Sequence, residues 1–147
     1  MNRLIIIIGL LALCSSEYIP PGPRYTCPKS LRKEQEQLLY PCVCIKGSDS
    51  GLYVECENTN LASLAVGFSN LAALQSPIES LSILSSNIGR LYGDIFYALD
   101  VRILRIENTP IKSIERDQFL GINNTLQELH LINSKLDNFP KEAFQIL

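Results

Sequence analysis

Cysteines are the side chains of this sequence with the most specific chemistry, and two of them, Cys42 and Cys44, stand one residue apart. Cysteines this close can be ligands of one metal ion, partners in a redox reaction, or halves of two different disulfide bridges. The choice depends on the compartment of the protein, on the other cysteines, and on the elements that hold them.

The N-terminal residues have the pattern of a secretory signal peptide. Arg3 gives a basic start, residues 4–13 form an almost unbroken apolar run, and small residues follow up to Ser16. The run is too short to cross a bilayer, which needs about 20 apolar residues. We expect residues 1–16 to be removed, so that the mature chain is secreted into the extracellular space without Cys14.

The mature chain keeps an even number of cysteines, which are Cys27, Cys42, Cys44 and Cys56. In an oxidising compartment, an even count favours two disulfide bridges over reactive thiols. A zinc site is disfavoured because its cysteines usually have the spacing C-x₂₋₄-C, and a redox pair usually has C-x-x-C. Four cysteines can be joined in three ways, and the sequence alone does not choose among them.

The composition disfavours several classes of function. The net charge is −2 and charged residues make up 19% of the chain, so no basic surface predicts nucleic-acid binding. Residues 17–147 contain no apolar run long enough to predict a membrane span. The sequence has no hydrolase, metalloprotease or phosphate-loop motif, so we expect no enzymatic activity, no cofactor and no metal.

Two segments precede the regular part of the chain. Residues 17–26 carry three prolines and are expected to form an extended lead-in. Residues 30–40 are a helical candidate, because Ser30 can cap the start of a helix and Pro41 blocks its continuation. We expect this helix to be a solvated insertion in a cysteine-rich segment at residues 27–56.

The rest of the chain repeats. The stretches "IESLSILSSNIGRL", "VRILRIENTPIKSI" and "LQELHLINSKLDNF" begin at residues 78, 101 and 126, and each has apolar residues at its positions 1, 4, 6, 11 and 14. A phenylalanine follows at position 19 of each. A degenerate copy precedes them, with Val54 and Cys56 at positions 4 and 6. This is the pattern of a leucine-rich repeat.

The physical basis of the pattern is one-sided burial. Positions 4 and 6 alternate with polar residues, as in a strand with one buried face, and neighbouring repeats must stack because one repeat cannot bury this face alone. Hydroxyl residues at position 9, namely Thr59, Ser86, Thr109 and Ser134, are expected to bond backbone groups where the strand turns.

The sequence therefore predicts an α/β solenoid, a short right-handed superhelix with a parallel sheet on its concave side and a disulfide cap at its N-terminal end. About four repeats are expected, at residues 51–77, 78–100, 101–125 and 126–147.

Side chains at positions 3, 5 and 7 are expected to face the concave side, each beside its counterpart in the next repeat. An apolar centre with charges nearby suits a modest protein-binding surface, whereas the alternative is ordinary solvated strand residues. The candidate partner-binding residues are Tyr53, Glu55, Leu84, Ile103, Arg105, Glu107, Glu128, His130 and Ile132. At position 5, His130 is expected to be a surface residue rather than a catalytic base.

The cysteine segment resembles the N-terminal flank of extracellular leucine-rich repeat proteins, the group with Slit-like proteins, Toll-like receptors and small leucine-rich proteoglycans. The likeness rests on "CP" at 27–28, "PCVC" at 41–44 and "YVEC" at 53–56, with the repeats behind them. It implies the bridges Cys27–Cys44 and Cys42–Cys56, and a function in binding an extracellular protein ligand or receptor. The segment between Cys27 and Cys42 is longer than in that family.

A second resemblance suggests an alternative function. The same flank, with hydroxyls at position 9, is similar to arthropod secreted repeat proteins named after the non-catalytic subunit of the decapod luciferin monooxygenase. This resemblance implies a non-catalytic subunit of a secreted enzyme complex.

Two surface features complete the expectations. Asn123-Asn124-Thr125 is the only N-x-[ST] sequon, so Asn123 is a candidate for glycosylation. Neither a second cysteine cluster nor a polar final repeat follows Phe144. We therefore expect the sequence to be a fragment of a longer solenoid, or its C-terminal edge to self-associate through exposed apolar residues.

Overall fold

The computed structural model describes residues 18–29 and 39–147. The expected signal peptide, and all but the last two residues of the expected helix at 30–40, lie outside the described residues.

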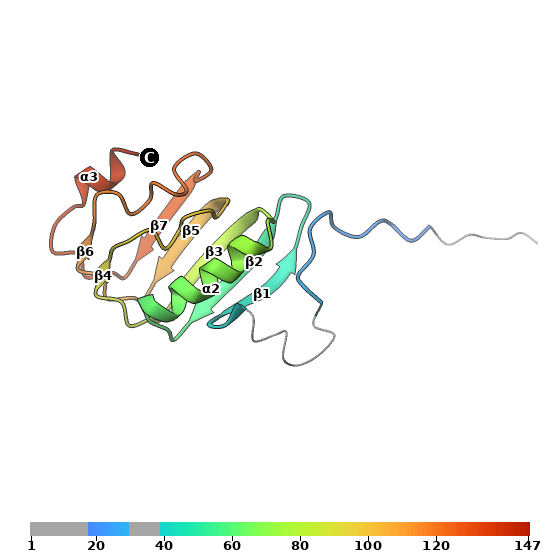
Figure 1. Cartoon of the computed structure of the whole chain (residues 1–147), viewed down its shortest axis with the longest axis horizontal. Helices are drawn as coiled ribbons and strands as arrows, with labels where there is room; N and C mark the ends of the chain where they lie inside the picture. Colours follow the sequence, from blue (N-terminus) through green and yellow to red (C-terminus); the bar gives the residue numbers. More distant parts are fainter. Residues whose placement is uncertain (1–17, 30–38) are drawn as a thin grey trace, which may run out of the picture.

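A five-stranded sheet in the order β1-β2-β3-β5-β7 carries the fold (Figure 1). Its strands are β1 (Cys42–Gly47), β2 (Leu52–Glu57), β3 (Ile78–Leu84), β5 (Val101–Glu107) and β7 (Glu128–Ile132). β1 runs antiparallel to β2, and all the other neighbours are parallel. The parallel sheet that the repeats predict is therefore confirmed, while the right-handed superhelix stays a prediction.

The register of the sheet follows the repeat frame. Position 4 of each repeat lies beside position 4 of the next, in the row Val54, Leu81, Leu104 and Leu129. In the repeat that begins at Ile78, all five frame residues are at most 2% exposed. Burial of these frame residues is the main favourable contribution to stacking, because their side chains are apolar and contact both neighbouring repeats.

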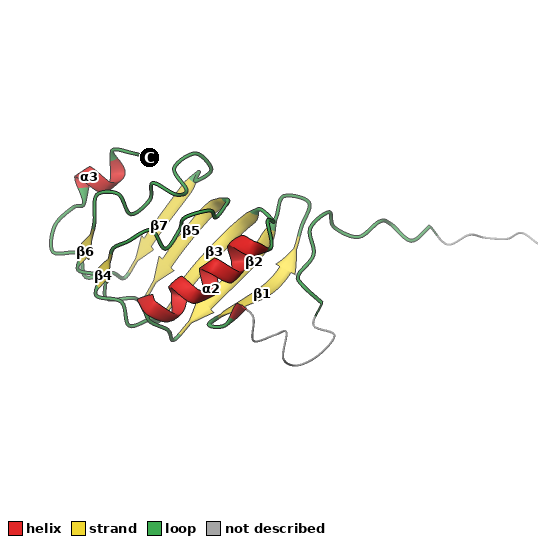
Figure 2. Cartoon of the chain, in the orientation of Figure 1, coloured by secondary structure: helices red, strands yellow, loops and turns green. Residues whose placement is uncertain are grey.

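The connections between the strands differ from one another (Figure 2). The connection from β2 to β3 contains the helix α2 (Leu61–Ala73), which lies against one face of the sheet, and the short α3 (Lys141–Phe144) follows β7 near the end of the sequence. The connections from β3 to β5 and from β5 to β7 contain β4 (Arg90–Leu91) and β6 (Ser113–Ile114), which pair in a second, two-stranded sheet.

The repeat frame did not predict α2, although local signals for it exist. Asn60 caps the helix, since its side chain accepts a hydrogen bond from the Ser63 amide at 3.0 Å. Gly67 lets the helix approach the segment before β1, because a Cβ there would lie 2.9 Å from Cδ of Pro41. The helix buries Phe68, which the frame also missed because it falls one position early.

Phenylalanine rings form a continuous column through the core. Their centroids are 5.6 Å apart for Phe68 and Phe96, and 6.1 Å apart both for Phe96 and Phe119 and for Phe119 and Phe144. Such ring pairs contribute about 0.5–1.5 kcal/mol each beyond the burial of their area. The column therefore links the interior of all the repeats.

One frame residue contradicts the expected burial. Phe139, at position 14 of the last repeat, is 72% exposed, whereas its counterpart Leu91 is fully buried. The reason is its place in the stack, because no strand of the described chain pairs with β7 on the side away from β5. Leu129 and Leu131 are half-buried on the same edge, which agrees with the partly exposed apolar C-terminal edge that the sequence predicts.

The hydroxyls at position 9 tie neighbouring repeats together. The Thr59 amide donates to Oγ of Ser86, and the Ser86 amide donates to Oγ1 of Thr109, each at 3.2 Å. These three residues are at most 7% exposed. The expected role of the hydroxyls is confirmed for Ser86 and Thr109, which accept these bonds.

Candidate partner-binding surface

The structure joins the cysteines as Cys27–Cys44 and Cys42–Cys56, which is the pairing that the family resemblance implies. The second bridge is in the core, because Cys42 is 2% and Cys56 0% exposed. Both bridges hold β1. Cys42–Cys56 joins it to β2, and Cys27–Cys44 joins it to the segment that precedes β1 in the sequence. In the structure the close pair Cys42 and Cys44 therefore fixes a strand rather than binding a metal.

The lead-in is also attached to this end of the sheet. The Arg24 amide donates to Oδ1 of Asp49 at 2.9 Å, and the Tyr25 amide donates to the Ser48 carbonyl at 3.1 Å. The chain passes so close to β1 that a Cβ on Gly47 would lie 1.8 Å from the Tyr25 carbonyl oxygen. The described residues nearer the N-terminus extend away from the body (Figure 1), and Tyr18 among them is 83% exposed.

Side chains at positions 3, 5 and 7 cover the face of the sheet opposite α2, which we call the open face. Strand register places them in the three expected columns. These columns are Tyr53, Ser80, Ile103 and Glu128; Glu55, Ser82, Arg105 and His130; and Glu57, Leu84, Glu107 and Ile132. The structure thus brings together all nine candidate partner-binding residues.

The first strand adds a residue that the repeat frame did not include. Val43 of β1 lies opposite Glu55 and therefore shares the open face, where it is 61% exposed. The signal for it was present, since the alternation Cys-Val-Cys is that of a strand with one buried face. The open face therefore extends across the disulfide-held cap.

Most charges on the open face have a partner there. Nε of Arg105 lies 3.2 Å from Oε2 of Glu107, and Nε2 of His130 lies 2.9 Å from Oε2 of Glu128. Nζ of Lys46, on β1, lies 4.5 Å from the centre of the Tyr53 ring, in a cation–π contact. His130 is thus on the surface, as expected, with a carboxylate as its neighbour.

The apolar residues of the open face are less exposed than the sequence predicted. Ile132 is 36% exposed, whereas Leu84 and Ile103 are half-buried. The difference follows from strand order, because β3 and β5 have a strand on each side and β7 has only one in the described chain. The apolar contribution of this surface is therefore largest at its two ends, at Val43 and Ile132.

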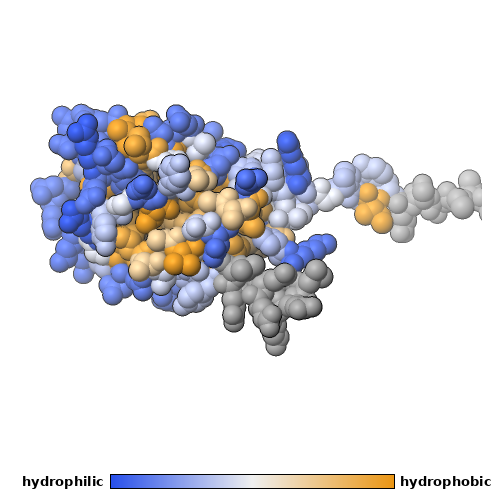
Figure 3. Space-filling view, in the orientation of Figure 1, coloured by the Kyte–Doolittle hydropathy of each residue, from blue (hydrophilic) through white to orange (hydrophobic). Residues whose placement is uncertain are grey.

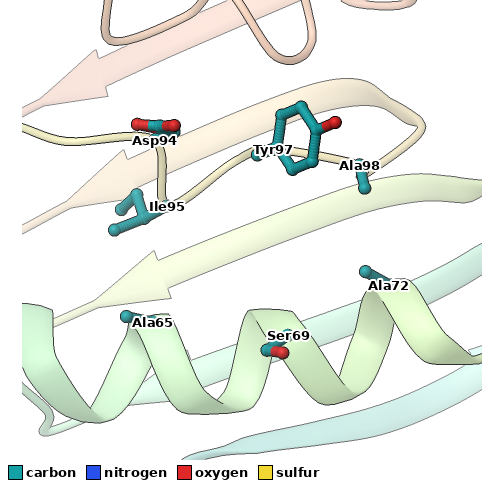
Figure 4. Close-up of a pocket in the computed structure, with 7 residues that line it drawn as sticks. All are labelled: Ala65, Ser69, Ala72, Asp94, Ile95, Tyr97 and Ala98. Atoms are coloured by element: carbon teal, nitrogen blue, oxygen red, sulfur yellow. The ribbon is translucent and has the colours of Figure 1, made fainter.

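A groove of about 410 Å³ lies on the opposite side of the molecule. Figure 4 shows three small residues of α2 (Ala65, Ser69, Ala72) along one wall, facing the segment 94–98. Apolar residues gather over α2 and beside it in Figure 3. The groove has one carboxylate, Asp94, and one phenol, Tyr97, which is too few polar groups to suggest a catalytic site.

The sequon lies in the turn before β7. Asn123 is half-buried. The Thr125 hydroxyl donates to the Val101 carbonyl at 3.0 Å and accepts from the Val101 amide at 3.2 Å. Thr125 therefore fastens the turn before β7 to the start of β5, and glycosylation of Asn123 stays a prediction.

Stacked L-x-x-L-x-L strands in a parallel sheet, with starts 23 and 25 residues apart, are typical of a leucine-rich repeat protein. The chain is 31% identical over 109 residues to leucine-rich repeat-containing protein 3B of Bos taurus, Mus musculus and Homo sapiens. The matched stretch is 73% of this chain and 39% of each of those relatives.

Neither a protein-family model nor a solved structure matches the chain. Within residues 18–29 and 39–147, no helix is both long and apolar enough to span a membrane.

Proposed function

We propose that the protein mediates protein–protein interaction outside the cell and that the open face of its sheet is the binding surface. One observation carries this proposal: the register of four parallel strands aligns apolar and charged side chains in a continuous surface, which Val43 extends. The leucine-rich repeat class supports it, because stacked repeats create extended binding surfaces.

The extracellular location is part of the proposal. It is supported by the signal-peptide pattern of residues 1–16 and by two disulfides, which persist in oxidising compartments. We infer that Asn123 carries a glycan on the secreted protein and that the protein is not itself an enzyme. Mass spectrometry of the secreted chain before and after glycosidase treatment tests the glycan.

The binding surface is tested by charge-neutral substitutions. The double variant Ile103→Ser, Ile132→Ser removes apolar area from the open face, while Val66→Ser, Tyr97→Ser removes it from the α2 side. After affinity capture of a partner from extracellular fluid, the first variant should weaken its binding about tenfold and the second should leave it unchanged. If only the α2-side variant weakens binding, the partner binds the other face.

A second candidate function is that of a non-catalytic subunit of a secreted enzyme complex. The position-9 hydroxyls that support the arthropod resemblance are those of the bonded row formed by Ser86 and Thr109. This candidate expects an enzyme to co-purify with the secreted protein in fixed stoichiometry and to lose activity when separated from it. Capture of a receptor or matrix protein without enzymatic activity contradicts it.

A further inference from the structure

Two carboxylates of the open face, those of Glu55 and Glu57, are neighbours on the same face of β2. Within the described residues, neither Glu55 nor Glu57 takes part in an ion pair. Lys46, the nearest cation by strand pairing, lies over the Tyr53 ring. Arg105 lies two strands away and is paired with Glu107.

The open face as a whole is acidic. It has four carboxylates, on Glu55, Glu57, Glu107 and Glu128, against the two cations of Lys46 and Arg105. On β2 neither carboxylate has an ion-pair partner within the described residues, whereas Glu107 pairs with Arg105 at 3.2 Å and Glu128 lies 2.9 Å from Nε2 of His130. Unpaired charges of one sign steer and orient a partner of the opposite sign.

The surroundings of the two carboxylates specify more than charge. Glu55 and Glu57 are alternate residues of one strand on one face, so their Cα atoms are roughly 7 Å apart. Val43 lies beside Glu55 on one side and Ser82 on the other, while Leu84 lies beside Glu57. The two carboxylates thus have aliphatic neighbours in Val43 and Leu84 and a small neighbour in Ser82.

From this arrangement we propose that the open face binds a basic, extended segment of its partner protein, with alternate cations of the segment on Glu55 and Glu57 and the aliphatic stems of the same side chains against Val43 and Leu84. The inference rests on the proposed function and specifies its partner. An extended segment fits because its side chains on one face recur with the same two-residue spacing as the two glutamates.

The test uses the secreted mature protein and synthetic peptides of defined charge. A fluorescein-labelled peptide of alternating lysine and valine is compared by anisotropy with one of alternating glutamate and valine. We expect the lysine peptide to bind about tenfold more tightly, with an affinity that falls as sodium chloride rises from roughly 50 to 300 mM.

A matched pair of variants locates the binding. Glu55→Gln with Glu57→Gln keeps side-chain size and should weaken lysine-peptide binding about fivefold or more. The control, Asp117→Asn with Glu142→Gln, changes the net charge equally at exposed positions off the open face, and should leave the affinity unchanged. Circular dichroism verifies that both variants are folded.

Three results would overturn the inference: no measurable binding of the lysine peptide, equal binding of the two peptides, or equal effects of the two variant pairs. None of them decides the proposed function, because the Ile103 and Ile132 substitutions change no charge and are measured with the natural partner. If those substitutions weaken partner binding while the glutamine variants do not, the open face is the binding surface but its partner is not basic.

Discussion

The side-chain hydroxyl of Thr109 accepts a hydrogen bond from the backbone amide of Ser86, 3.2 Å away, and donates one to the carbonyl of Glu107 at 3.1 Å. Thr109 is fully buried. One hydroxyl therefore satisfies two backbone groups from successive repeats in a place that water does not reach.

Replacement of Thr109 by valine should destabilise the protein. It keeps the shape of the side chain but leaves the buried amide of Ser86 without a partner, so the free energy of unfolding should fall by about 1–3 kcal/mol. Thr109→Ser keeps the hydroxyl and should cost less than the valine variant. Urea denaturation followed by circular dichroism measures both, and a valine variant as stable as the serine variant would contradict this role.

The two disulfides should contribute unequally to stability. Loss of Cys42–Cys56 by paired serine substitution should lower the free energy of unfolding by about 2–5 kcal/mol, because both sulfurs are also part of the core. Loss of Cys27–Cys44, whose cysteines are half-buried, should cost less. Peptide mapping of the non-reduced protein should recover both bridges, and four free thiols would refute this arrangement of the cap.

The apolar edge beyond β7 should cause residues 17–147 to self-associate. A groove of about 470 Å³ there is lined mainly by Leu129, Leu131, Leu136, Phe139 and Phe144. Exposed apolar surface of this kind favours association. Phe139→Ser should shift the chain toward monomer in sedimentation velocity, whereas Tyr97→Ser, at an equally exposed aromatic on another surface, should not. A chain that is monomeric at high concentration would argue against this.

The repeat frame predicted the parallel strands and the open-face columns, because both follow from a side-chain period that stacking makes the same in every repeat. It missed α2 and Phe68, since the first repeat departs from that period and its helix depends on local signals such as the Asn60 cap. Frame positions also do not report what covers a side chain, which is why Phe139 was expected in the core.

The ion pairs of the open face could not be predicted from the sequence, for a different reason. Whether Arg105 contacts Glu107, or Lys46 lies over Tyr53, depends on rotamers and on the β1–β2 register, which has an irregularity between Cys44 and Lys46. The columns were predictable because they need only strand order. That Glu55 and Glu57 take part in no ion pair among the described residues became visible only with side chains in place.

The column of phenylalanine rings has a consequence for folding cooperativity. Because each ring stacks only on its neighbours, stability should be transmitted from repeat to repeat in a nearest-neighbour manner. A cavity at an interior ring such as Phe96 or Phe119 would then divide the chain into two units that melt at different denaturant concentrations. The disulfide-linked unit would be the last to unfold, and single-transition unfolding would become two-step.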